Sequence, residues 1–246
     1  MMIYPIGTSE ASIHACRLLS IPSISFTDHP CPEITHLMLD VPSFGPDGLL
    51  RDGRSIERTL SMIPQNTRII GGNLNIPCLE GYTKLDLLQD PIYLAANAKI
   101  TADCALRLCA GKLKTTFSDT PALVIGWGRI GKCLARMLRE IGSPVTVCAR
   151  KVTDRAMICA LGYNACAIEE ISGTLKDHSL IFNTVPATLP DLHLPEGILA
   201  YELASIPGLP ADQAVAAGGL PGKLAPYSSG KLIADTIFRL CKEDMS

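Results

Sequence analysis

The stretch that most constrains the fold of this chain is residues 121–150, which read PALVIGWGRIGKCLARMLREIGSPVTVCAR. An apolar run from Pro121 to Ile125 leads into GWGRIG at residues 126–131. A helical pattern from Lys132 to Ile141 follows, and then a second apolar run from Pro144 to Cys148. Strand, glycine turn, helix and strand in this order are typical of the βαβ unit that binds a dinucleotide.

Each glycine of the turn has a separate expected role. Gly126 allows the tight turn, Gly128 lets the backbone approach a pyrophosphate, and Gly131 lets the helix pack closely on the strand. The helix that follows offers free N–H groups and the positive end of its dipole to phosphate oxygens. Because glycines also mark ordinary turns, a purely structural βαβ turn is the alternative. We predict a cofactor site that includes Gly126, Trp127, Gly128, Arg129, Ile130 and Gly131.

The residues after the second strand indicate which dinucleotide binds. Sites that select NAD place an acid about 20 residues beyond the glycines, where it accepts the ribose hydroxyls. This chain has Ala149, Arg150 and Lys151 at that place. A guanidinium grips a phosphate bidentately and a lysine adds charge, whereas an acid would repel the 2′-phosphate. The sequence favours NADP, with NAD as the other possibility.

The composition narrows the class of protein and of partner. With 246 residues and 47% hydrophobic content, the chain is long enough to bury a sizeable core. Its net charge of −2 speaks against nucleic acid or an anionic membrane as a partner and favours small molecules or other proteins. No apolar run reaches the roughly 20 residues of a membrane span, so a cytoplasmic protein is expected. Ten cysteines without CxxC spacing predict buried reduced thiols, and scattered histidines predict no metal site.

The element pattern predicts an α/β protein, a Rossmann-type doubly wound parallel sheet with a smaller N-terminal α/β domain. Residues 1–100 are assigned to the N-terminal domain and residues 101–246 to the dinucleotide-binding domain with its C-terminal helix. Pro91–Asn97 is expected to be extended, and a connector helix to begin at Thr101, which caps it. In the second domain, a short helix is expected around 211–217, a loop at 218–222, and a last helix at 229–242.

Several motifs of the second half resemble those of one family. These are LVIGWGRIGKCLAR, CARK, LIFNTVPA (180–187), YELASIPG (201–208) and GGLPGKLAPYSSGKLIADTI (218–237). Together they resemble the A subunit of dipicolinate synthase. The resemblance covers about the whole second half and continues faintly into the first. It implies an NADP-linked dehydrogenase of spore-forming bacteria that oxidises dihydrodipicolinate to dipicolinate. The implied partner is a flavoprotein B subunit, and the implied assembly is a homo-oligomer.

The resemblance also implies roles for individual residues. The glycine turn and Arg150 would hold the cofactor phosphates, and Gly219 would lie near the nicotinamide within the loop 219–222. The path from adenosine to nicotinamide would be lined by Asn183, Thr184, Val185, Pro186, Ala204 and Ser205. The chain departs from the family in a shorter N-terminal part, and in Lys99, Asp103 and Glu202, where proline, glutamate and aspartate are usual.

Oxidising a dihydropyridine dicarboxylate requires a base for a proton and cations or N–H groups for two carboxylates. Asp103 is the candidate base, and Lys223 and Lys99 are the candidate cations, with the N–H groups at Thr101 as a second anion site. At each of these positions, the alternative is a residue that only caps a helix or lies on the solvated surface. Two other functions stay open: a dehydrogenase of another small acid, such as a hydroxy acid or a shikimate-like acid, and a non-catalytic NADP-binding subunit or sensor.

Overall fold

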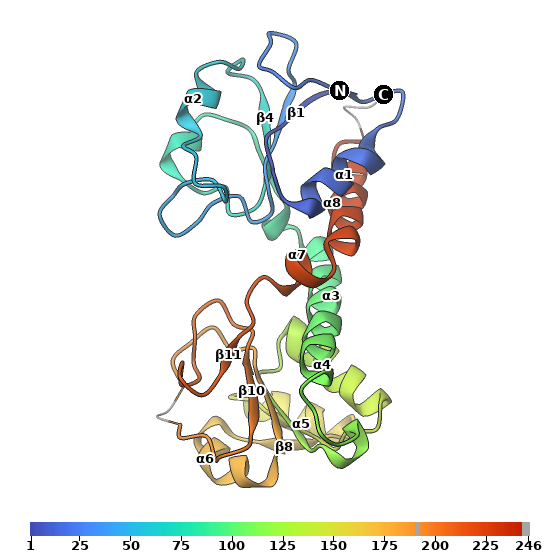
Figure 1. Ribbon diagram of the computed structural model, residues 1–246, viewed down its shortest axis with the longest axis vertical. Helices are drawn as coiled ribbons and strands as arrows, with labels where there is room; N and C mark the ends of the chain where they lie inside the picture. The colour runs from blue at the N-terminus through green and yellow to red at the C-terminus, as the bar shows by residue number, and fades with distance from the viewer. Residues whose placement is uncertain (190–191, 243–246) are drawn as a thin grey trace. The chain divides into compact units, whose positions relative to one another are not determined.

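The computed structural model describes residues 1–189 and 192–242 (Figure 1). The chain forms two compact units. The first unit consists of Met1–Asn97 together with the chain from Pro221 onward, and the second unit is Ala98–Leu220. Each unit contains one sheet whose strand pairs are parallel, with helices between the strands. The predicted α/β class is therefore confirmed.

The sheet of the first unit has the strand order β2-β1-β3-β4-β5. Ile3, Leu37 and Ile69 are fully buried within it, as expected of strands whose two faces are both covered. Since the chain leaves β1 first toward one edge and then returns to its other side, the carboxyl ends of β1 and β3 form the switch point of this sheet. The strands are β1 (Met2–Pro5), β2 (Ser25–Phe26), β3 (His36–Met38), β4 (Arg68–Gly71) and β5 (Lys84–Asp86).

The C-terminal helix α8 (Pro226–Leu240) packs against α1 (Glu10–Leu19) in the first unit. Gly230 makes the close approach possible, because a Cβ there would lie 2.5 Å from the carbonyl oxygen of Ala11. Ile233 and Ile237 are buried in the same apolar cluster as Ala15 and Leu19. The sequence assigned this helix to the second domain, and the structure places it with the first. The remaining helical segments of this unit are α2 (Glu57–Leu60), η1 (Pro77–Leu79) and η2 (Leu87–Gln89).

The sheet of the second unit has the order β11-β10-β9-β6-β7-β8. Its strands are β6 (Ala122–Ile125), β7 (Val145–Cys148), β8 (Asn164–Cys166), β9 (Leu180–Asn183), β10 (Leu199–Glu202) and β11 (Val215–Ala216). Its helical segments are α4 (Arg129–Glu140), α5 (Val152–Ala160), α6 (Ile171–Thr174), η3 (Phe117–Asp119), η4 (Ile168–Glu170) and η5 (Leu175–Asp177). This is the doubly wound order, with β6 in its centre.

The predicted start of the connector helix is wrong. A single helix, α3, runs from Pro91 to Ala110, so the expected extended segment is its first two turns. Pro91 fits the first helical position, and the Asp90 carboxylate accepts the N–H of Tyr93 at 2.7 Å as a cap. Thr101 consequently lies buried in mid-helix. Because mid-helix N–H groups are bonded within the helix, the anion site expected at Thr101 does not exist.

Residues 211–222 also differ from expectation. The predicted helix around 211–217 is absent, since Val215 pairs with Tyr201 and forms β11 at the edge of the sheet. The predicted loop at 218–222 is partly helical, because α7 spans Leu220–Leu224. Gly219, at a φ of +68°, makes the turn between the two. Edge pairing with β10 outweighs the local helical tendency of the alanines.

All ten cysteines are free. Cys104, Cys109 and Cys148 are buried as expected for structural thiols, whereas Cys159 is exposed on α5. Within the described part of the chain, no helix is long and apolar enough to cross a membrane.

Candidate dinucleotide-binding site

The glycine turn lies at the switch point of the second sheet. Strand β6 pairs with β7 on one side and β9 on the other, so the residues after β6 and β9 flank the crevice at the carboxyl ends of the strands. Thr184 joins the two ends, since its N–H and its hydroxyl both donate to the carbonyl oxygen of Ile125 at 2.9 Å. This is the place at which doubly wound sheets bind ligands.

The three glycines of the turn meet different surroundings. Gly126 has a φ of +108°, and a Cβ there would lie 2.5 Å from Thr184 Oγ1. A Cβ on Gly131 would lie 2.1 Å from the Gly126 carbonyl oxygen. Gly128 has a φ of −80°, and a Cβ there would meet nothing within 4 Å. The fold therefore requires glycine at 126 and 131 but not at 128, where the open space suits the approach of a ligand.

Helix α4 begins beside that open space. Gly128 is its N-cap, and no side chain caps the helix. The first N–H groups of α4 have no intrahelical acceptor, and the helix dipole places partial positive charge there. Arg129 is exposed on this first turn, and Trp127 and Ile130 are half-buried. The turn combines donors, positive charge and steric room, which are the features that a pyrophosphate requires.

Basic side chains gather at the end of β7. Ala149 is buried, whereas Arg150 and Lys151 are exposed, and Lys151 is the N-cap of α5. Arg155, one turn into α5, donates from Nη1 to the carbonyl oxygens of Ala149 and Arg150, each at 2.8 Å. The sequence reasoning missed Arg155, although its spacing of four from Lys151 was a usable signal. These two hydrogen bonds hold the loop that carries Arg150 and Lys151 in place.

Asn183, expected to line the cofactor path, is turned inward. Its side chain is fully buried at the end of β9, and Nδ2 donates to both Glu202 oxygens, at 3.0 and 2.9 Å. Its Oδ1 accepts the N–H of Val185 at 3.0 Å. The outward positions after β9 are Thr184 and Val185, both half-buried, and the exposed Pro186. Asn183 therefore affects the crevice only indirectly, by fixing the positions of Glu202 and Val185.

Glu202 organises the loop after β10. Its Oε1 accepts the N–H of Ala204 at 2.9 Å, and its Oε2 accepts those of Gly208 and Leu209 at 2.8 and 3.0 Å. The loop is thereby held with Ala204 half-buried and Ser205 exposed. The sequence marked Glu202 only as a departure from a family pattern. The usable signal was an acid at the end of an apolar strand, which has to find several donors when it is buried.

The candidate catalytic residues belong to different units. Asp103 is exposed on α3 in the second unit, one turn beyond Lys99. The Lys99 charge acts on Cys133 of α4, where burial raises the pKa of the thiol and the nearby ammonium opposes that rise. Lys99 and Asp103 therefore lie on a face of α3 near the helix that follows the glycine turn. Lys223, exposed on α7, belongs to the first unit, and Gly219 is exposed just before α7.

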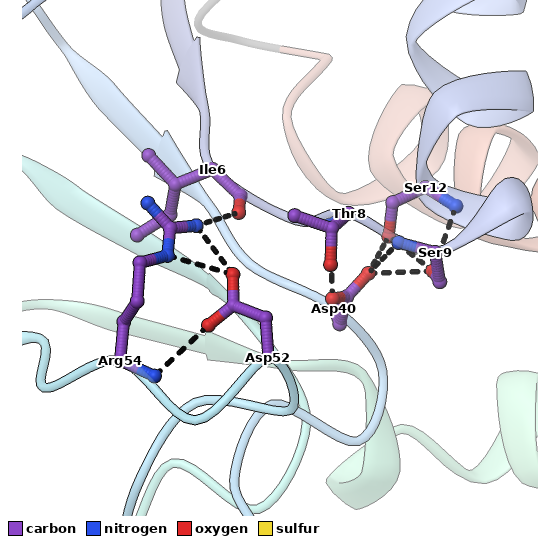
Figure 2. Close-up of polar contacts among 7 residues, drawn as sticks. All are labelled: Ile6, Thr8, Ser9, Ser12, Asp40, Asp52 and Arg54. Carbon is purple, nitrogen blue, oxygen red and sulfur yellow. Dashed lines mark hydrogen bonds and ion pairs between the residues drawn. The ribbon is translucent and has the colours of Figure 1, made fainter.

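The switch point of the first sheet holds a carboxylate of its own (Figure 2). Asp40, after β3, accepts the N–H groups of Thr8 and Ser9 at 3.0 and 3.1 Å, and the hydroxyls of Ser9 and Ser12 at 2.5 and 2.6 Å. These donors form the start of α1. Gly7 is required beside them, because a Cβ there would lie 2.9 Å from Asp40 Oδ1. Asp40 thus takes the place that an anionic ligand would occupy at this helix.

One cation lies at the same edge of the first sheet. Arg54 donates from Nε to Asp52 at 2.7 Å and from Nη2 to the carbonyl oxygen of Ile6 at 3.2 Å, just beyond β1 (Figure 2). Its side chain is 56% exposed. Sequence reasoning missed Arg54 because nothing local connects its loop with β1.

The comparisons with known proteins agree with this fold. No family model matches the chain. The A subunit of dipicolinate synthase from Bacillus subtilis is 27% identical over 159 residues, which are 60% of this chain and 54% of the relative. A crystal structure of the corresponding A subunit from Bacillus halodurans superposes with a TM-score of 0.82 at 20% identity, covering 97% of each chain. The resemblance to the A subunit of dipicolinate synthase is confirmed.

The sequence match and the structural superposition cover different shares of these proteins. The sequence match leaves nearly half of the Bacillus subtilis protein unmatched, whereas the fold is shared over almost the whole chain. Transhydrogenase from Sinorhizobium meliloti also shares the fold, with a TM-score of 0.70 at 12% identity over 99% of this chain and 94% of that one. The doubly wound parallel α/β architecture is therefore shared with these proteins.

Proposed function

We propose that this protein is an NADP-dependent dehydrogenase that oxidises a dihydropyridine dicarboxylate, dihydrodipicolinate, to dipicolinate. The observation that carries the proposal is the open space at Gly128, a glycine that the fold itself does not require. That space adjoins an uncapped helix N-terminus at the switch point of a doubly wound sheet. The confirmed resemblance to the A subunit of dipicolinate synthase supports the reaction.

The residues present suit a phosphorylated dinucleotide. The first N–H groups of α4 would hold the pyrophosphate, and Arg150 and Lys151 would hold the 2′-phosphate, with Arg155 bracing their loop. When bound, NADP supplies the hydride acceptor. The backbone beyond Thr184 and the loop that Glu202 holds would line the nicotinamide half.

The substrate chemistry assigns the remaining roles. Aromatising a dihydropyridine removes one hydride, which goes to the nicotinamide, and one proton, which goes to a base. Asp103 would accept the proton, as an exposed carboxylate on the face of α3 that also carries Lys99. Lys99 and Lys223 would bind the substrate carboxylates.

The same resemblance supports a proposal for the partner. An A subunit implies a second kind of chain, and we propose that this partner is a flavoprotein B subunit. The protein would act in the cytoplasm of a spore-forming cell as a homo-oligomer. One alternative is a non-catalytic NADP-binding role beside that flavoprotein. The other is oxidation of a different small acid.

A stand-alone assay tests the function. Purified protein is mixed with NADP and freshly generated dihydrodipicolinate, and reduced nicotinamide is followed by absorbance. We expect turnover without any second protein, and its loss in Asp103→Asn. Turnover with a 2-hydroxy acid or a shikimate-type acid instead would identify a different substrate. Turnover that requires an added flavoprotein, with cofactor binding intact, would identify a non-catalytic role.

A further inference from the structure

A hollow of about 390 Å³ lies on the second unit, apart from the glycines of the turn. Three cations of α4 line it, Lys132, Arg136 and Arg139. Their spacing of four and three residues places them on one face of the helix. The buried residues of α4, such as Leu134 and Leu138, lie on another face. The size is that of a site for a small molecule.

The cations of this hollow are positioned by aromatic rings. Lys132 Nζ lies 5.6 Å from the centre of the Trp127 ring, and Arg139 Cζ lies 4.2 Å from that of Tyr163. The two rings meet edge to face, with 6.0 Å between their centres. Arg139 also donates to the carbonyl oxygen of Leu161 at 2.6 Å. Such contacts hold the two cations in place but leave their charge uncompensated.

Of the three cations in the hollow, only Arg136 has a carboxylate partner in the described part of the chain. Arg136 donates from Nε to Glu140 at 2.7 Å. Across residues 1–189 and 192–242, no carboxylate forms an ion pair with Lys132 or Arg139. Two of the three cations are thus available to an anion.

The lining of the hollow also includes apolar side chains. Met157 and Leu161, at the end of α5, line the hollow and are 55% and 49% exposed. A lining that combines cations with apolar side chains suits a molecule with an apolar body and a negatively charged group. An aromatic carboxylate has both within the available volume, and its ring can lie against a thioether and an isobutyl group.

Trp127 connects the hollow with the dinucleotide site. It lines the hollow and stands between Gly126 and Gly128 in the turn. A molecule in the hollow would therefore contact a residue whose backbone is part of the glycine turn. We propose that this hollow binds an aromatic carboxylate, and that its occupancy changes the affinity of the turn for the dinucleotide.

The single tryptophan makes the binding directly measurable, because all indole emission comes from Trp127. Dipicolinate is titrated into the protein without cofactor, with glutarate and inorganic phosphate in parallel. We expect a saturable change in emission with dipicolinate, and at least tenfold weaker binding of glutarate and phosphate. Equal binding of all three would overturn the aromatic preference, and the absence of a saturable change would overturn the site.

Substitutions locate the bound molecule. Lys132→Gln and Arg139→Gln should each weaken dipicolinate binding about tenfold or more, whereas Lys176→Gln, at an exposed lysine elsewhere in the unit, should not. Thermal unfolding confirms that each variant is folded. Gly128→Val, which obstructs the dinucleotide site, should retain dipicolinate binding. If Gly128→Val abolishes binding and the α4 variants leave it unchanged, the molecule binds at the cofactor site and the inference is overturned.

The proposed coupling between the hollow and the dinucleotide site is measured separately. The factor by which dipicolinate changes NADP affinity must equal the factor by which NADP changes dipicolinate affinity. We expect a factor of about five or more, reduced toward one in Lys132→Gln. A factor of one in the wild-type protein would overturn the coupling and leave the site. None of these measurements requires turnover, so they stand or fall separately from the proposed reaction.

Discussion

The carboxylate of Asp90 accepts a hydrogen bond of 2.6 Å from Arg239 Nη2, although 149 positions separate the two residues. The same carboxylate accepts the N–H of Tyr93 at 2.7 Å. Asp90 therefore caps α3 and at the same time ties α8 to the start of that helix. Burial alone raises the pKa of Asp90, but the bonds from Tyr93 and Arg239 outweigh it and hold the pKa below its ordinary value.

We predict that Asp90→Ala lowers the free energy of unfolding by about 1–2 kcal/mol at neutral pH, because a helix cap and an ion pair are lost together. Asp235→Ala removes an exposed ion pair with Lys231 on α8 and should cost under about 0.5 kcal/mol. Urea unfolding followed by circular dichroism measures both. Equal effects of the two substitutions would contradict the assignment.

The contribution of Asp90 should depend on pH. Because its pKa is lowered on folding, the stabilisation is complete above the unfolded pKa of about 3.9 and is lost as the pH falls through the folded pKa. The difference in unfolding free energy between wild type and Asp90→Asn should therefore shrink on acidification. A difference that stays constant down to the acid transition would show that the charge of Asp90 is irrelevant.

Substitutions of two glycines in the turn should have opposite consequences. Gly128→Val should abolish dinucleotide binding and keep the fold, because its side chain enters open space meant for the pyrophosphate. Gly131→Ala should destabilise the fold instead, since its Cβ would lie 2.1 Å from the Gly126 carbonyl oxygen. Circular dichroism and cofactor titration separate the two. Retained binding in Gly128→Val would mean that the turn is only structural.

The basic residues after β7 should select the cofactor. We predict that NADP(H) binds more tightly than NAD(H), and that Arg150→Ala costs about 1.5–3 kcal/mol of NADP affinity through loss of a bidentate phosphate contact. NAD affinity should be nearly unchanged in the same variant. Calorimetric titration of both cofactors decides the matter, and an Arg150→Ala protein that still prefers NADP would refute it.

Glu202 should be a structural acid. Glu202→Gln replaces a carboxylate that accepts five hydrogen bonds with an amide that presents a donor to other donors. We expect a loss of about 1.5–3 kcal/mol in unfolding free energy. Glu196→Gln, at an exposed loop position, is the control and should change stability little. If Glu202→Gln is as stable as this control, then the loop after β10 does not depend on that charge.

The βαβ unit around the glycine turn was predictable because its signals lie within about 30 consecutive residues. Alternating apolar runs, three glycines and a helical stripe each have a local physical meaning. The end of α4 shows this well, since Gly142 has a φ of +90° and donates to Arg139 while Ser143 donates to Leu138. That is the glycine-ended helix cap, in which only neighbouring residues take part.

The start of α3 was mispredicted for a related reason. The sequence predicts that Pro91–Asn97 is extended, yet an acid followed by a proline, as at Asp90 and Pro91, is also a favourable helix start. Local chemistry allowed both outcomes. The bond from Arg239, far away in the sequence, favours the helix.

The sequence by itself determined the glycine turn between β6 and α4, the basic residues that follow β7, and the α/β class, because short-range chemistry encodes each of them. Only the tertiary structure decided that α8 belongs with α1, that Asn183 and Glu202 bond to each other, and that Trp127 shares a hollow with Tyr163. An apolar stripe shows that a helix buries one face but not which partner covers it. The partner is chosen by shape, here the absence of a side chain at Gly230, and by buried polar groups that must find each other across the fold.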